Sequence, residues 1–258
     1  MGDWVHYLPI KWMALVIFTI VYLTAIVIFT IVMTLAKKGE RAKAFKGLTS
    51  GLLSPLGAIF GLLVLFIVFQ VFSDFDRAKM AVDREASAIR TVVLLAISFP
   101  GEPENQIRNR IRRHVDESVS LEWPAMAKQA ATVKVAAPAL SEALRVALFL
   151  TPRNDGQILA RNEIVKELEI AMDARRERIN LSRSTVNWVK WMCMFAQAVC
   201  TLVAIAMIHS DNRAAAAIAM GIFATGVAVS GLLIASHDRP FSGQIRVEPD
   251  VLLHVRPE

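Results

Sequence analysis

Four long stretches of the sequence are apolar and contain no charged side chain: residues 12–36, 51–73, 191–208 and 214–236. An α-helix rises about 1.5 Å per residue and the hydrocarbon layer of a bilayer is about 30 Å thick, so roughly 20 apolar residues are enough to cross it. Short polar segments connect the first two stretches and the last two. The pattern therefore predicts four transmembrane helices arranged as two hairpins.

Residues 74–190, between the second and third stretches, are polar and follow a helical pattern. Directly after Ser73 the chain continues to Pro100 without another proline or a glycine, and its apolar residues recur mostly every three or four positions. We therefore expect one continuous helix of about 45 residues that begins in the second span. Shorter helices should follow, and from Gln157 a second long helix should run without a break into the third span.

The two ends of the chain have their own patterns. Residues 1–11 are amphipathic and contain Trp4 and Tyr7, aromatic residues suited to the headgroup layer. Residues 237–258 contain three prolines and alternating apolar residues, so we expect an extended tail. Two interpretations of this tail stay open: a strap across a neighbouring subunit, or a disordered end.

These elements together predict an all-α membrane protein with a helical extramembrane domain between spans 2 and 3. Its four parts are an interfacial segment with a transmembrane hairpin, the helical domain, a second hairpin and the extended tail. Their expected bounds are 1–73, 74–190, 191–236 and 237–258.

Composition supports a membrane protein. The chain has 258 residues, of which 55% are hydrophobic and 20% charged, and its mean hydropathy is +0.45. These values are too apolar for an ordinary soluble domain. We attribute the formal net charge of +6 to Lys and Arg that flank the membrane. No face is basic enough to predict a nucleic-acid partner.

The sequence contains no motif of a catalytic, metal or cofactor site. Two of the five histidines, His209 and His237, are separated by the fourth span, so they cannot share a metal. There is no phosphate-binding glycine loop, nucleophile elbow or dinucleotide fingerprint. Carboxylates such as Glu163 and Glu167 lie among Lys and Arg at helical spacing, which is typical of a solvated face. We therefore expect no enzyme, no cofactor and no metal.

The second span carries the most informative pattern. Its first half has small residues at helical spacing and its second half is rich in phenylalanine. One interpretation is close packing against neighbouring helices. The other is a ring of identical helices around an axis, which would form a hydrophobic constriction able to gate by dewetting. The residues that would face this axis are Leu62, Leu65, Phe66, Phe69 and Ser73.

Two local matches carry a family resemblance. The stretch from Pro55 through the phenylalanine-rich helix into Phe75-Asp76-Arg77 resembles the bacterial bestrophin stretch that ends in Tyr-Asp-Arg-Trp-Trp-Glu. The segment that begins at Asp238, Asp-Arg-Pro-Phe-Ser-Gly, is similar to the Asn-Pro-Phe-Gly that follows the last bestrophin span. The order of spans and polar domain also resembles the bestrophins, and specifically bacterial bestrophin-like proteins of unknown function.

The resemblance implies a homopentameric, anion-conducting channel embedded in the lipid bilayer, with small anions as its permeant partners. The second span would line the pore neck, with Leu62, Leu65, Phe66 and Phe69 at its narrowest part. Asp76 and Arg77 would lie in the vestibule beyond it. Two departures stand out: Ala78 and Lys79 replace the paired tryptophans, and the tail lacks the acidic cluster of the calcium site in animal bestrophins.

The family's arrangement implies an inner-membrane protein with the large domain in the cytoplasm. The Lys and Arg of the short segments do not favour this orientation, because the connection between spans 1 and 2 is strongly basic. The sequence therefore leaves sidedness open. An alternative function is a non-conducting membrane scaffold or sensor whose helical domain binds a partner, since no ionisable residue inside the spans marks a transport path.

Overall fold

The computed structural model describes residues 8–36, 50–132 and 138–258. The chain forms two compact units, Met1–Phe72 with Thr185–Asp238 and Ser73–Ser184 with Arg239–Glu258. Regular structure in the described ranges is entirely helical. The expected interfacial segment falls largely on residues 1–7, and the basic connection between spans 1 and 2 falls on residues 37–49, so both lie outside the described residues.

The first unit contains the predicted spans. They are α1 (Ile10–Leu35), the first part of α3 (Leu53–Ala96), α8 (Trp188–Ile208) and α9 (Arg213–His237), with a short 3₁₀ turn, η2 (Ser50–Leu52), before α3. All four helices are long and apolar enough to cross a membrane. The prediction of four transmembrane helices is thereby confirmed for the described residues.

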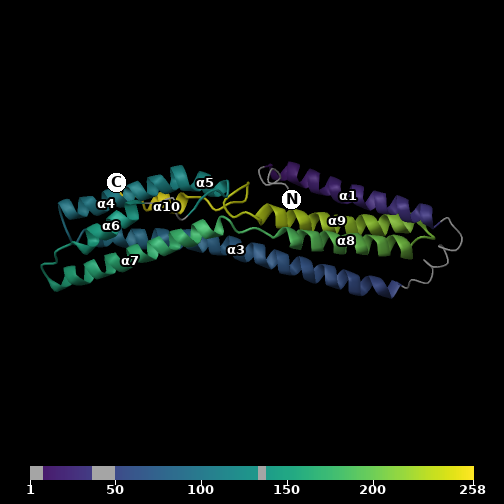
Figure 1. Ribbon diagram of the computed structural model, residues 1–258, viewed down its shortest axis with the longest axis horizontal. Coiled ribbons are helices and arrows are strands. Elements are labelled where there is room, and N and C mark those ends of the chain that lie inside the picture. Colours follow the sequence, from purple (N-terminus) through teal and green to yellow (C-terminus); the bar gives the residue numbers. More distant parts are fainter. Residues whose placement is uncertain (1–7, 37–49, 133–137) are drawn as a thin grey trace. The chain divides into compact units, whose positions relative to one another are not determined.

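Helices α1, α8 and α9 pack side by side in the first unit (Figure 1). The buried residues of α1 recur every three or four positions, so one face of the helix lies against its neighbours. Tyr22 on α1 shares a 2.7 Å hydrogen bond with Thr225 on α9. Near the end of α9, the carboxylate of Asp238 accepts a 2.6 Å hydrogen bond from the backbone N–H of Val186. These polar contacts fix the register of otherwise apolar helices.

The second unit is a helical bundle built from elements far apart in the sequence. After the second part of α3 come α4 (Glu102–Glu117), the π-helical segment η3 (Ser118–Glu122), α5 (Trp123–Ala127), α6 (Pro138–Leu148), α7 (Asp155–Leu181) and α10 (Asp250–His254). The fully buried aliphatic residues of its core come from five of these helices: Ile89, Ile107, Ile111, Leu140, Ile164, Leu168 and Leu252.

The long second helix is confirmed, because α3 runs for 44 residues without interruption. It ends at Ala96, shortly before Pro100, where the sequence predicts the stop. Gly101 has a φ of +94°, a conformation that residues with a Cβ rarely adopt. Pro100 directly precedes Gly101. Pro103 stands in the first turn of α4, where its missing N–H costs nothing.

Two expectations about local structure are wrong. The second long helix does not continue into the third span, because α7 ends at Leu181 and α8 begins at Trp188. Asn187 caps α8 by accepting the backbone N–H of Val189 at 3.0 Å, so a new helix starts there. The tail is not wholly extended either. It contains α10, and its apolar residues Phe241 and Leu252 are buried in the core of the second unit.

Candidate pore-lining face and buried ionic cluster

The first part of α3 has one buried face and one exposed face. Phe60, Ile67 and Val71 are only 3–7% exposed and pack inside the first unit, where the ring of Phe60 lies 5.3 Å from that of Phe223. The opposite face is uncovered by the described chain. The four predicted neck residues all lie on it and are between 53% and 72% exposed: Leu62, Leu65, Phe66 and Phe69.

The spacing of these four residues explains their common direction. Positions three, four and seven residues apart lie on one side of an α-helix, so the side chains form a single apolar stripe. The small residues of the span are exposed too. A Cβ added to Gly57 or Gly61 would meet no atom of the described chain within 4 Å. Close packing against the described residues of the same chain therefore does not account for these glycines.

The remaining predicted site residues lie on the part of α3 that belongs to the second unit. Ser73 is half-buried, whereas Asp76 and Arg77 are exposed. The guanidinium of Arg77 lies 3.3 Å from the carboxylate of Glu177 on α7, in an ion pair open to solvent. Solvent weakens such a pair to less than about 1 kcal/mol. Arg77 is thus partly neutralised, whereas Asp76 has no ion-pair partner among the described residues.

A second feature, a buried ionic cluster, was not predicted from the sequence. We define it as Glu85 on α3, His114 on α4, Glu122 on η3, and Arg175 and Arg178 on α7. Arg178 donates to both oxygens of Glu85, at 2.7 and 3.1 Å, and to Glu122 at 3.0 Å. Arg175 donates twice to the other oxygen of Glu122, at 2.8 and 2.6 Å. The Nε2 atom of His114 lies 2.9 Å from Glu85.

Electrostatics keeps Glu85 and Arg178 ionised. Burial by itself raises the pKa of Glu85, but the charge of Arg178 and the hydrogen bond and charge of His114 outweigh burial and lower this pKa to about 2. Burial likewise opposes charge on Arg178, yet Glu85 and Glu122 raise its pKa above the ordinary value. The hydrogen bonds of Arg175 and Arg178 to Glu85 and Glu122 link α3, η3 and α7 inside the unit.

The π-helical segment explains how Glu122 reaches the cluster. A π turn inserts an extra residue and shifts the facing of the residues that follow it, and such turns are frequent at functional sites. Glu122 closes this segment, and Trp123 comes next. The indole ring of Trp123 lies under the guanidinium of Arg178, with the Cζ atom 4.5 Å from the ring centroid. Two buried polar atoms, Nδ1 of His114 in the cluster and Oγ of Ser118 at the start of η3, have no hydrogen-bond partner among the described residues.

The cluster could have been found from the sequence. Arg178 follows Ala171 and Ala174 on the apolar stripe of α7, and Glu85 lies three residues after the buried Val82 on α3. Charged residues on a buried stripe indicate partners in the interior, because an unpaired charge is too costly to bury. By contrast, Glu163 is on the solvated face as predicted, paired at 2.8 Å with the exposed Lys166.

Comparison with known proteins agrees with this architecture. The Bestrophin-like domain family matches residues 19–252 of the chain. A search of the curated proteins found no match to the sequence. Among solved structures, two variants of a bacterial bestrophin homologue from Klebsiella pneumoniae have the same fold. One has a TM-score of 0.70 at 13% identity and covers 94% of this chain and 95% of its own. The other has a TM-score of 0.68 at 14% identity, covering 93% and 96%.

A third solved structure, described as a membrane protein, gives a TM-score of 0.70 at 15% identity and covers 92% of this chain and 96% of its own. At identities this low, the structural matches establish a common fold and nothing further. The family match extends over most of the chain and includes α3, α8 and α9 and the larger part of α1. The protein is therefore a multi-pass membrane protein that belongs to the Bestrophin-like family.

Proposed function

We propose that the protein is a bestrophin-like ion channel in which the exposed apolar stripe of α3 lines the neck of a pore shared by identical subunits. The observation that carries this proposal is the exposure of Leu62, Leu65, Phe66 and Phe69 on the face of α3 that turns away from its own unit. A ring of such faces forms a narrow apolar passage, which is wet when open and dewetted when closed.

Exposure alone does not separate a pore from a lipid-facing surface. Residues of α9 such as Ile218 and Ile222 are also exposed, at 64% and 71%, and we assign them to lipid. Two further observations favour α3 for the pore. Its stripe is preceded by Gly57 and Gly61, which have open space around them and permit a neighbouring helix to approach closely. The chain belongs to the Bestrophin-like family, and the bestrophin resemblance also assigns the pore neck to the second span, which is the first part of α3.

The finer properties follow from the family resemblance and are part of the proposal. We propose a homopentamer that conducts small anions and resides in the bacterial inner membrane, with the second unit in the cytoplasm. Asp76 and Arg77 would border the vestibule. Since Arg77 pairs with Glu177 and Asp76 has no ion-pair partner among the described residues, the charge at this point gives no preference for anions. Selectivity would then depend on the dehydration of ions in the neck.

Flux through reconstituted protein tests the neck. Purified protein in liposomes should release chloride faster than empty liposomes, and the double variant Phe66→Ala/Phe69→Ala should raise the rate because a wider, less apolar neck dewets less readily. The matched control is Ile218→Ala/Ile222→Ala, which removes exposed apolar side chains from α9 and should leave the rate unchanged.

Three outcomes decide the proposal. Equal effects of the two double variants would contradict a special role for α3. Chloride release no faster than from empty liposomes, measured on an oligomer that electron microscopy shows to be intact, would refute the channel and favour a non-conducting scaffold. A view down the membrane normal with α3 outermost would refute the pore assignment directly.

A further inference from the structure

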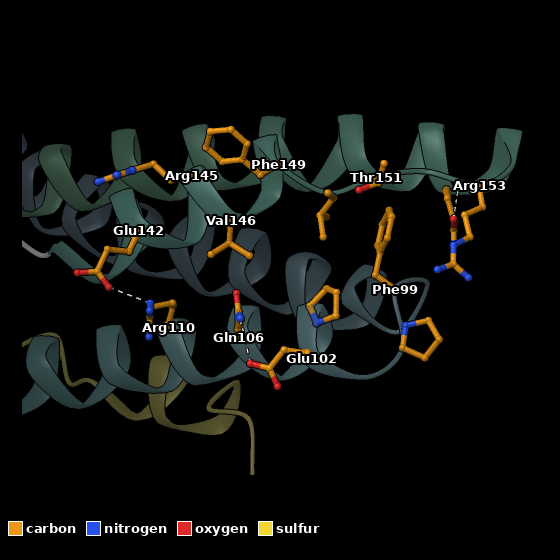
Figure 2. Close-up of a pocket in the computed structure, with 14 residues that line it drawn as sticks. Phe99, Glu102, Gln106, Arg110, Glu142, Arg145, Val146, Phe149, Thr151 and Arg153 are labelled. Carbon is orange, nitrogen blue, oxygen red and sulfur yellow. Dashed lines mark hydrogen bonds and ion pairs between the residues drawn. The ribbon is translucent and has the colours of Figure 1, made fainter.

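The second unit contains a pocket of about 780 Å³ next to the turn between α3 and α4. It lies between α4 and α6 and is closed at one end by the loop before α7 (Figure 2). Its volume falls within the range of about 300 to 1,000 Å³ that is typical of sites for small organic ligands. The channel proposal makes no use of this pocket.

The carboxylates of the pocket are already engaged. Glu142 on α6 accepts a 2.6 Å hydrogen bond from Arg113 and lies 2.8 Å from the Nε atom of Arg110, so two guanidiniums neutralise it. Glu102 on α4 accepts a 2.9 Å hydrogen bond from the amide of Gln106. The charge of Glu142 is thus offset before any ligand arrives, whereas Glu102 accepts a hydrogen bond from a neutral amide and keeps its charge.

Two cations in the lining remain available. Arg145 on α6 and Arg153 in the loop before α7 are exposed, and neither guanidinium has a carboxylate partner within the described ranges. Figure 2 shows them at opposite ends of the pocket. A guanidinium presents a planar set of donors that matches a carboxylate in a bidentate pair. Each end of the pocket therefore favours one anionic group.

The space between these ends is apolar on one side. Phe99, Val146 and Phe149 lie between the two arginines (Figure 2). Phe149 is 84% exposed, an unusual position for a phenylalanine ring outside the membrane spans, and covering it would release ordered water. A hydrocarbon segment laid between the arginines would cover this ring.

The loop that carries Arg153 is held in place without a ligand. The side-chain oxygen of Gln157 accepts the backbone N–H of Arg153 at 2.7 Å, and its amide nitrogen donates to the carbonyl of Ser98 at 2.7 Å. Asn154 caps α7 by accepting the backbone N–H of Gln157 at 2.9 Å. A preformed loop lowers the entropic cost of binding, because little has to become ordered.

We propose that this pocket binds a small organic dianion, specifically a dicarboxylate with a hydrocarbon chain between its two charged ends. One carboxylate pairs with Arg145, the other with Arg153, and the methylene groups lie against Phe149. The proposal predicts a dependence on length. A longer dicarboxylate such as suberate covers more of the ring than succinate does and brings its second carboxylate closer to the second arginine.

Calorimetric titration of the purified full-length protein in detergent tests the site. Suberate should bind with a Kd at least about tenfold lower than succinate, since each additional buried methylene and the second ion pair contribute. Arg145→Gln and Arg153→Gln should each weaken suberate binding by about tenfold, the loss of one charge-assisted contact, and should affect succinate less.

The control variant is Arg90→Gln, which alters another exposed arginine of the second unit outside the pocket and should leave the Kd unchanged. Substitutions at exposed positions rarely change stability much, so all three variants should remain folded. Equal affinity for suberate and succinate, equal effects of the three variants, or no saturable binding of suberate would each overturn the proposal. None of these results depends on whether the protein conducts ions.

Discussion

Arg178 donates two hydrogen bonds to the carboxylate of Glu85, at 2.7 and 3.1 Å, and both side chains are completely shielded from solvent. A pair of this kind gains little over an apolar substitute, but it is expensive to break, because one removed partner leaves the other as a buried charge. The stability of the second unit therefore depends on the cluster remaining complete.

Breaking this pair should be strongly destabilising. Arg178→Met leaves Glu85 and Glu122 without their shared cation, and we expect a loss of about 3–5 kcal/mol. The double variant Glu85→Gln/Arg178→Met should lose less than the sum of its single changes. Denaturant unfolding in detergent, followed by tryptophan fluorescence, measures these losses. Arg176→Met is the control, since its ion pair with Asp173 is exposed. A loss as small as that of the control would contradict a structural role for the cluster.

The same pair predicts a pH dependence with a definite sign. The pKa of Glu85 is lowered in the folded state from 4.5 to about 2. The ionised carboxylate therefore stabilises the fold above pH 4.5, and this contribution is lost progressively as the pH falls toward 2. We expect the stability difference between wild type and Glu85→Gln to shrink over this interval. Unfolding curves at several pH values measure it, and a constant difference would argue against an ionised Glu85.

Gly61 distinguishes packing within one chain from packing between chains. The described chain leaves open space around it, so Gly61→Leu should be accepted by the isolated subunit. If identical α3 helices approach one another there, the added side chain separates them and the oligomer dissociates. Mass photometry in detergent measures the assembly. Gly226→Leu on α9, also in open space, is the control. Unchanged assembly in both variants would remove Gly61 from the subunit interface.

Trp123 connects the cluster to the C-terminal tail. Its indole N–H donates to the carbonyl of Val247 at 3.1 Å, and the ring of Phe241 meets it edge-on at 5.9 Å. Trp123→Phe keeps an aromatic ring but loses the hydrogen bond, so we expect a loss of about 1 kcal/mol and faster proteolysis of the tail. Limited proteolysis with mass spectrometry locates the cleavage. Cleavage spread evenly over the chain would indicate general destabilisation instead.

The sequence predicts the scaffold well because its signals are local. Uncharged stretches define the spans, and the apolar spacing of α3 continues unbroken past Ser73. The break between α7 and α8 could not be predicted in this way, since no glycine or proline marks it. The segment between the two helices is held by a tertiary contact, because the N–H of Val186 donates to the carboxylate of Asp238, which is 52 positions away in the chain.

The candidate sites likewise have a part that local sequence signals predict and a part that they do not. Helical spacing places the four neck residues on one face of α3, and the described residues leave this face exposed. Their role in a pore stays a prediction. The buried cluster needed the π turn that brings Glu122 inward, and sequence patterns for ordinary helices do not predict such a turn. Arg178 on an apolar stripe was the available signal.

The burial of Leu252 in the core of the second unit has a consequence for biosynthesis. Most of this unit is translated before spans 3 and 4, but one of its fully buried residues, Leu252, is translated after them. A nascent chain cannot complete this interior until spans 3 and 4 have been synthesised, because Leu252 follows both of them. Chaperones therefore have a long interval in which to encounter an unfinished bundle, and a premature stop codon would leave it permanently incomplete.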